Sequence, residues 1–261
     1  MRSGLPCGAV FATAFTGVSI YQLLLVAGVA LFASVLGGVA GYGTGALMPL
    51  VLVPILGPEP VVPIIAIAGV FNNTWRALAF WRLIEWRRAL LIAACATPGC
   101  IVSAYGFTLL TGMGAQLVIG TMLMLTVPLR YTLRRRAVVL HSRGLVLGAA
   151  GYGAAVGGTV GAGVILLSLL MSAGLAGQAV IATDAVLSIF IGGSRLVVFA
   201  LAGAITGKTI AFALLIGIVA FPGAFLAKAF VERLPLHVHT AILDAVVLLG
   251  GAVMVFGALT R

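Results

Sequence analysis

Two arginines and one aspartate lie inside long apolar stretches of this sequence. Arg76 lies in the apolar stretch 60–81, and Asp184 and Arg195 lie in the stretch 178–203. A charge at membrane depth is costly and points to function by default, and the arginine fork matches planar or tetrahedral oxyanions. We therefore interpret both arginines as candidate binding groups for a small anion. The alternative is that both lie near a helix end and extend to the aqueous surface.

The spacing of Asp184, Ser188, Gly192 and Arg195 places these residues on one face of a predicted helix. Asp184 and Arg195 are then roughly 16 Å apart along the helix axis and do not pair with each other. Asp184 either carries a proton that is coupled to transport or forms the polar start of the helix beside Thr183. The corresponding face of the first half holds Asn73 and its polar neighbours but no acid.

Two glycine clusters interrupt membrane-length apolar runs. Residues 37–43 (GGVAGYG) recur as residues 157–163 (GGTVGAG), with the glycines aligned without a gap. In lipid, a broken backbone is tolerated only inside protein or beside a water-filled cavity, and a helix that restarts there presents N–H groups that favour an anion. The clusters therefore predict an anion site. Close packing of helices through small residues is the alternative interpretation.

The composition excludes a water-soluble protein. Of the 261 residues, 62% are hydrophobic and 8% are charged, and the mean hydropathy is +1.27; soluble domains carry about 25% charged residues. Apolar stretches at about 18–56, 60–81, 89–111, 115–133, 144–171, 178–203, 207–230 and 238–259 predict about eight transmembrane segments. The fold class is therefore an all-α, polytopic membrane helical bundle.

The basic residues predict how the chain is oriented in the cell inner (plasma) membrane. With eight single crossings, most arginines, including Arg82 and Arg143, fall on the side of both termini, which predicts cytoplasmic termini. The stretch 18–56 is too long for one straight helix, so it is either a broken helix or a tight hairpin, and a hairpin would alter this count. The net charge of +10 follows from this membrane pattern, so we expect no nucleic-acid partner.

Further matches extend the glycine repeat. Arg76 aligns with Arg195, and Pro98-Gly99 finds a counterpart in Pro222-Gly223. We therefore expect two homologous repeats whose first helices are broken by glycine: an N-terminal repeat (1–133), a basic cytoplasmic linker (134–143) and a C-terminal repeat (144–261). Transporters are commonly built from such repeats, with the substrate at the repeat interface. Whether these repeats are parallel or inverted depends on the glycine-broken stretches.

Motifs for other chemistry are missing from the sequence. It contains no nucleophile elbow, Walker loop or metal-binding helix motif, so we expect neither an enzyme nor a cofactor. His237 and His239 lack acidic or cysteine neighbours that would make them a metal site. Asp244 in the last span is either a second proton site or a partner for a polar group of a neighbouring helix.

The paired glycine clusters, the stretch Ala182-Thr183-Asp184 leading to Ser194-Arg195, and the paired Pro-Gly steps resemble the sulfite exporter TauE/SafE family over about residues 20–258. The resemblance implies a two-repeat bundle that moves sulfite, sulfonates or related sulfur oxyanions, usually outward. The chain departs from the family pattern at Asp184, where a serine is expected, and after Gly163, where the run of glycines stops.

The sequence thus predicts a secondary exporter of a small sulfur oxyanion, with proton coupling as an open alternative. Its expected partners are the anion and the lipid bilayer, and a homo-oligomer is left open. Another small anion such as a carboxylate, an uptake direction, and a membrane enzyme or assembly subunit are the alternatives. Asp184 is the candidate for proton coupling. The candidate substrate-binding residues are Gly38, Gly41, Gly43, Asn73, Arg76, Gly158, Gly161, Gly163, Thr183, Ser194 and Arg195.

Overall fold

A computed structural model describes residues 15, 17–40, 43–135, 142–231 and 236–260. In these residues the fold is all-α, which confirms the predicted class, with ten α-helices and one short 3₁₀ turn. The helices are α2 (Ile20–Ala40), α3 (Gly43–Leu56), α4 (Val61–Ala79), α5 (Trp86–Thr108), α6 (Gly112–Arg135), α7 (Ser142–Val156), α8 (Gly163–Ser172), α9 (Gln178–Leu201), α10 (Gly207–Val231) and α11 (Leu236–Leu259); the turn η1 is Trp81–Leu83.

Four of these helices are long and apolar enough to cross a membrane: α4, α5, α6 and α9. Shorter apolar segments lie in α2, α3, α8, α10 and α11. Large side chains such as Leu201, Phe256 and Val102 are exposed on the outside of the bundle, as expected for a surface that faces lipid. Helices satisfy their own backbone hydrogen bonds, which is why apolar runs of this length fold as helices in a bilayer.

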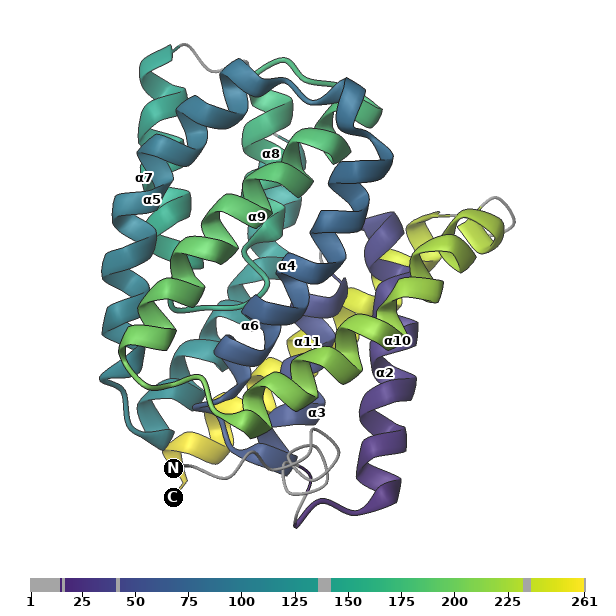
Figure 1. Cartoon of the computed structure of the whole chain (residues 1–261), viewed down its shortest axis with the longest axis vertical. Helices are drawn as coiled ribbons and strands as arrows, with labels where there is room; N and C mark the ends of the chain where they lie inside the picture. Colours follow the sequence, from purple (N-terminus) through teal and green to yellow (C-terminus); the bar gives the residue numbers. More distant parts are fainter. Residues whose placement is uncertain (1–14, 16, 41–42, 136–141, 232–235, 261) are drawn as a thin grey trace, which may run out of the picture.

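The glycine-rich runs each form two helices. Of the two alternatives for the run 18–56, the structure has the hairpin, and the run 144–171, expected as one segment, also forms two helices. The run 18–56 contains α2 and α3, which pack against each other. The run 144–171 contains α7 and α8, and a Cβ added at Gly148 in α7 would lie 2.7 Å from a methyl group of Leu169 in α8. The chain therefore folds back on itself at the second glycine cluster, and Figure 1 shows the same reversal between α2 and α3.

Several connections between helices lie at two ends of the bundle (Figure 1), whereas the segment 157–162 lies inside it. At one end, the connection between α8 and α9 lies beside the start of α5, since Gly174 approaches the Arg88 guanidinium. We call this the basic end, because its described exposed or half-exposed basic side chains are Arg82, Arg87, Arg88 and Arg143.

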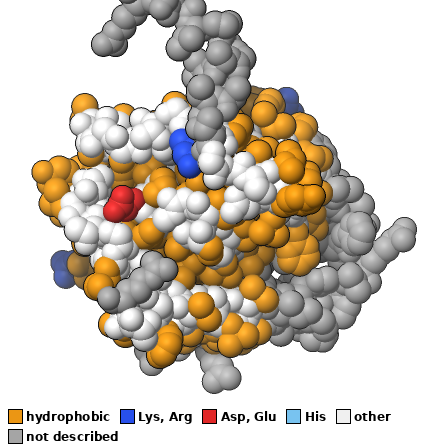
Figure 2. All heavy atoms as spheres, turned by 90° about the horizontal axis from the view of Figure 1, so that it is seen from below, with side chains coloured by type: hydrophobic (Ala, Val, Ile, Leu, Met, Phe, Trp, Pro, Cys, Tyr) orange, Lys and Arg blue, Asp and Glu red, His pale blue; other side chains and the backbone are white. Residues whose placement is uncertain are grey.

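The opposite end holds both ends of the described chain, and we call it the terminal end. Phe15 packs edge-to-face on Phe212 near the start of α10. Gln116 near the start of α6 donates a hydrogen bond to the Met254 carbonyl near the end of α11 (2.9 Å). Figure 2 views the molecule from this side, where charged side chains are scarce, and Lys208 is exposed near the start of α10.

Close helix contacts occur where the sequence places Pro-Gly steps. A Cβ added at Gly99 in α5 would lie 2.9 Å from the Ala154 amide nitrogen of α7. A Cβ added at Gly223 in α10 would lie 2.8 Å from the Ser34 side chain of α2. The two predicted counterparts therefore mark two equivalent contacts, α5 with α7 and α10 with α2.

A buried ion pair joins α6 to α11. Arg130 Nη1 lies 2.9 Å from Asp244 Oδ1, and both side chains are less than one-tenth exposed. Of the two alternatives for Asp244, the structure thus supports a partner for a polar group of a neighbouring helix. Arg130, which the orientation count treated as a surface cation, is instead buried at this helix contact.

The α5–α7 contact gives a direct test of the packing. A Cβ at Gly153 would overlap the Ala96 backbone, whereas a Cβ at Gly151, on the same helix, would meet nothing within 4 Å. We expect Gly153→Ala to lower the free energy of unfolding by about 2 kcal/mol or more because the backbones must separate.

The matched variant Gly151→Ala should retain or slightly raise stability, because alanine favours helix by up to about 1 kcal/mol. Thermal unfolding in detergent, followed by size-exclusion chromatography, measures both. Equal stability of the two variants would contradict the close α5–α7 contact.

Candidate functional site

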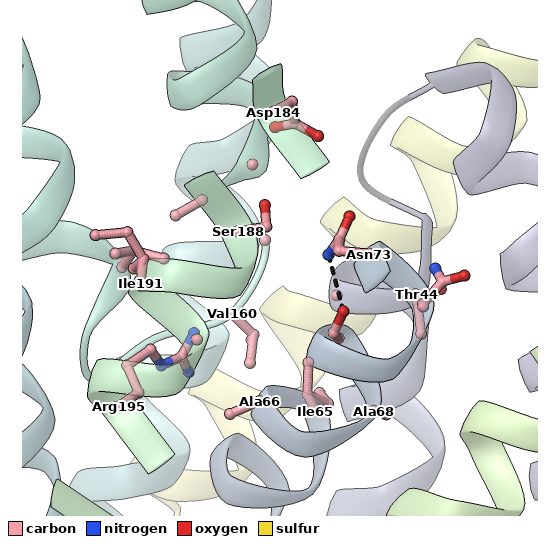
Figure 3. A pocket seen from close by; sticks show the side chains of 18 of the residues that line it. Thr44, Ile65, Ala66, Ala68, Asn73, Val160, Asp184, Ser188, Ile191 and Arg195 are labelled. Atoms are coloured by element: carbon pink, nitrogen blue, oxygen red, sulfur yellow. Dashed lines mark hydrogen bonds between the residues drawn. The ribbon is translucent and has the colours of Figure 1, made fainter. Parts of the chain in front are cut away.

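A cavity of about 190 Å³ lies between the two halves of the chain. Residues from α2, α3, α4, α7, α8, α9 and α10 and from the segment 157–162 line it. Figure 3 shows its side chains, with Asp184 at one end and Arg195 at the other. The polar and charged side chains that line it are Ser34, Thr44, Asn72, Asn73, Arg76, Tyr152, Thr159, Asp184, Ser188 and Arg195.

Two helices begin at this cavity, one after each glycine cluster. Thr44 and Gly45 from the first turn of α3, and Gly161 to Gly163 before and at the start of α8, are lining residues. A Cβ at Gly45 would lie 3.3 Å from the Gly161 amide nitrogen, so the two chain breaks meet. The first N–H groups of the two helices and the positive ends of their dipoles therefore lie close together, an arrangement that favours a negative charge.

Glycine is required at the second break. Gly161 has a φ of +81°, which is a backbone conformation that residues with a Cβ rarely adopt. It also lies against α6, because an added Cβ would come within 3.1 Å of the Thr126 hydroxyl oxygen. The turn before α8 thus depends on this residue for both its conformation and its fit.

Arg195 supplies a buried cation at one end of the cavity. Only 7% of the residue is exposed, Nη2 donates to the Thr159 carbonyl oxygen (3.1 Å), and the guanidinium carbon lies 5.9 Å from the centre of the Phe199 ring. Nε is buried and makes no hydrogen bond. A buried donor without a partner carries a desolvation penalty of about 1–3 kcal/mol, which a bound acceptor would remove.

Arg76 and Asp184 form an ion pair at the other end of the cavity. Arg76 Nη2 lies 3.4 Å from Asp184 Oδ2, with the Asp184 side chain 5% exposed and the Arg76 side chain 23% exposed. Arg76 Nη1 also donates to Asn73 Oδ1 (3.0 Å), and Asn73 Nδ2 donates to the Gly69 carbonyl oxygen (2.9 Å). Asp184 thus pairs across the halves with Arg76 and not with Arg195, in agreement with their separation along α9.

The structure brings together six of the candidate residues. Asn73, Arg76, Gly161, Gly163, Asp184 and Arg195 all line the cavity.

Three other candidates have different surroundings and are not among the lining residues. The Thr183 hydroxyl accepts a hydrogen bond from the Glu85 amide (3.2 Å). Ser194 donates to the Phe190 carbonyl oxygen within its own helix. Gly158 packs against Ser103 and Phe107 of α5.

The candidates of the first glycine cluster lie at the end of α2, at the start of α3 and outside the described residues. Gly38 lies in the last turn of α2 and Gly43 is the first residue of α3. Gly41 lies outside the described residues.

Sequence reasoning missed Tyr152 and Thr159. Tyr152 is 3% exposed in the middle of α7 and lines the cavity. A single tyrosine in an apolar helix carries no periodic signal. Thr159 contributes a backbone carbonyl group to Arg195, and no side-chain pattern records such a contact. Asn72 and Ser188 were noted only as members of polar helix faces, and both are lining residues.

Comparison with known proteins gives one family match. The model of the family described as sulfite exporter TauE/SafE matches residues 26–254. This confirms the resemblance drawn from the glycine clusters and the Pro-Gly steps. No curated protein and no solved structure matches the chain.

The matched region contains every residue that lines the cavity. The members of this family are transporters and not enzymes, and the apolar helices are those of a multi-pass membrane protein. The chain therefore belongs to the sulfite exporter TauE/SafE family and is a membrane transporter of sulfur-containing anions.

Proposed function

We propose that the protein is a secondary transporter that exports sulfite or a short organosulfonate and binds it in the cavity between α4 and α9. The buried, unpartnered Nε of Arg195 carries this proposal, because it is a cationic donor on the cavity wall without an acceptor. A sulfur oxyanion presents several acceptor oxygens around one centre, which suits an arginine fork.

The starts of α3 and α8 add to this anion site. Their first turns meet at Gly45 and Gly161 beside the cavity, so their N–H groups can act on the same anion. The volume of about 190 Å³ suits a small oxyanion with a short substituent better than a large metabolite.

We further propose that α2–α6 and α7–α11 are two inverted repeats joined by the predicted linker 134–143. Helix contacts support this, because three contacts between the halves have a counterpart: α5–α7 matches α10–α2, α5–α9 matches α10–α4, and α6–α8 matches α11–α3. The corresponding helices α4 and α9 are antiparallel, since Arg76 faces Asp184 while Gly192 faces Val70. The corresponding helices α6 and α11 are also antiparallel, since Arg130 faces Asp244 while Gln116 faces Met254. Antiparallel counterparts are expected for repeats related by an axis in the membrane plane.

We also propose an orientation in the membrane that differs from the expected one. The expectation of cytoplasmic termini assumed eight single crossings, whereas the two hairpins place Phe15 and Thr260 at the terminal end, opposite Arg82, Arg87 and Arg143. We therefore place the basic end in the cytoplasm and the terminal end outside. Arg76 lies toward the basic end and is more exposed than Arg195, which supports loading of the site from the cytoplasm.

Asp184 is the proposed proton carrier. It is a buried carboxylate on the cavity wall that pairs with Arg76. Protonation would release Arg76 toward an anion, which links proton and anion movement in one site.

Replacing Arg195 tests the anion site. In proteoliposomes that contain labelled sulfite or sulfoacetate, we expect Arg195→Gln to reduce the initial efflux rate at least tenfold, because the buried cation is lost. The matched variant Arg87→Gln removes an exposed arginine at the start of α5 and should retain the parent rate. If Arg195→Gln transports as fast as the parent, the proposed role of Arg195 is overturned. If the parent itself transports no sulfur anion, the proposed substrate is overturned.

Replacing Asp184 tests the proton link. We expect transport by Asp184→Asn to respond less than twofold to an imposed pH gradient that changes the parent rate severalfold, because the variant has no titratable carboxylate at this position. Glu85→Gln, a change of an exposed acid, should respond as the parent does. A full gradient response in Asp184→Asn would exclude this residue as the proton carrier.

Cysteine labelling tests the orientation. In a variant whose native cysteines are replaced by alanine, a membrane-impermeant maleimide added to intact cells should label Lys208→Cys and leave Arg143→Cys unlabelled until the cells are opened. Both positions are exposed and lie at opposite ends of the bundle. The reverse labelling pattern would contradict the proposed orientation and support cytoplasmic termini.

A further inference from the structure

The described charged side chains that line the cavity are two arginines and one aspartate. Their formal charges leave one positive charge in excess. We propose that the site selects anions with a single negative charge over doubly charged anions of the same shape, and that Asp184 sets this preference. The inference rests on the proposed function of the cavity as an anion site, and it specifies the charge class of the substrate.

Asp184 compensates one of the two cations. Its Oδ2 lies 3.4 Å from Arg76 Nη2, and its side chain is 5% exposed, so bulk water does not screen this charge as it would on the surface. Arg76 is also held by Asn73 Oδ1 at 3.0 Å. With both interactions in place, Arg76 brings no net charge to a bound anion.

The second cation is not compensated by an acid. Among the residues that the structure describes, the two ion pairs are Arg76–Asp184 and Arg130–Asp244, and neither includes Arg195. The hydrogen bond from Arg195 to the Thr159 carbonyl oxygen is to a neutral group, and Nε is left without an acceptor. Figure 3 shows Asp184 and Arg195 at different ends of the cavity, so the acid cannot serve both arginines at once.

Charge matching then favours a single negative charge. One anionic charge neutralises Arg195, whereas a second charge in the same small cavity is repelled by the Asp184 carboxylate. For charges on the order of 10 Å apart at an effective dielectric constant of about 20, this repulsion changes relative affinity roughly tenfold. The preferred ligands are thus a sulfonate group or the singly protonated form of sulfite.

The test compares two tetrahedral oxyanions of similar size whose charges are constant near neutral pH: methanesulfonate, with one charge, and sulfate, with two. Each is added as a competitor to labelled sulfite transport in proteoliposomes at one fixed pH. In the parent we expect half-inhibition by methanesulfonate at a concentration at least tenfold below that of sulfate.

Three variants separate charge from local geometry. Asp184→Asn leaves two uncompensated arginines and should shift the ratio of the two inhibitory concentrations at least tenfold toward sulfate. The double variant Arg76→Gln with Asp184→Asn restores one excess positive charge, so its ratio should return toward the parent value even though both side chains have changed. Glu85→Gln removes an acid that does not line the cavity and should retain the parent ratio.

The outcomes distinguish the two proposals. If neither competitor inhibits and sulfite is not transported, the proposed function fails. If both inhibit the parent equally, or if Asp184→Asn keeps the parent ratio, the anion site remains and the role of Asp184 in charge selection is overturned. If Asp184→Asn elutes as aggregate in size-exclusion chromatography, the double variant tests the proposal in its place. A ratio in the double variant that is shifted toward sulfate would also overturn the proposal.

Discussion

The structure depends on one constraint: a backbone that is not hydrogen-bonded cannot face lipid. Two helices, α3 and α8, start after glycine-rich breaks, and their first N–H groups have no partner in the preceding turn. Both starts are therefore placed inside the protein, where Gly45 and Gly161 come into contact. The hairpins, the close approach of the surrounding helices and the polar cavity all follow from the need to enclose these ends.

The charged side chains follow from the same enclosure. Arg195 is tolerated at 7% exposure because it lies against a carbonyl group, an aromatic ring and a cavity that can hold an anion. Arg76 is tolerated because Asp184 and Asn73 bind it. The two arginines align in the sequence but differ in their partners, so they bring unlike chemistry to one site.

The features that could be predicted from the sequence are those that are energetically unfavourable in a bilayer. Charges inside apolar runs and glycines inside helices stand out against a background of leucine, valine and alanine, so Arg76, Asp184, Arg195 and the breaks could be found. The pairing of Arg76 with Asp184 could not, because no local pattern states which residues meet across the halves. The reversal within 142–172 was also hidden, and for the run 18–56 the sequence left a broken helix and a hairpin open, since a continuous apolar run has the same composition whether the helix crosses or turns back.

The antiparallel pairing of α4 with α9 has a consequence for movement. Suppose that the two halves of the proposed repeat exchanged conformations. The same types of helix contact would remain, but the surroundings of Arg76 and Arg195 would be interchanged. Arg195 would then take the more open environment that Arg76 has now, and Arg76 would become enclosed. A single chain with unequal halves could thus present its bound anion first to one side of the membrane and then to the other, without any new type of contact.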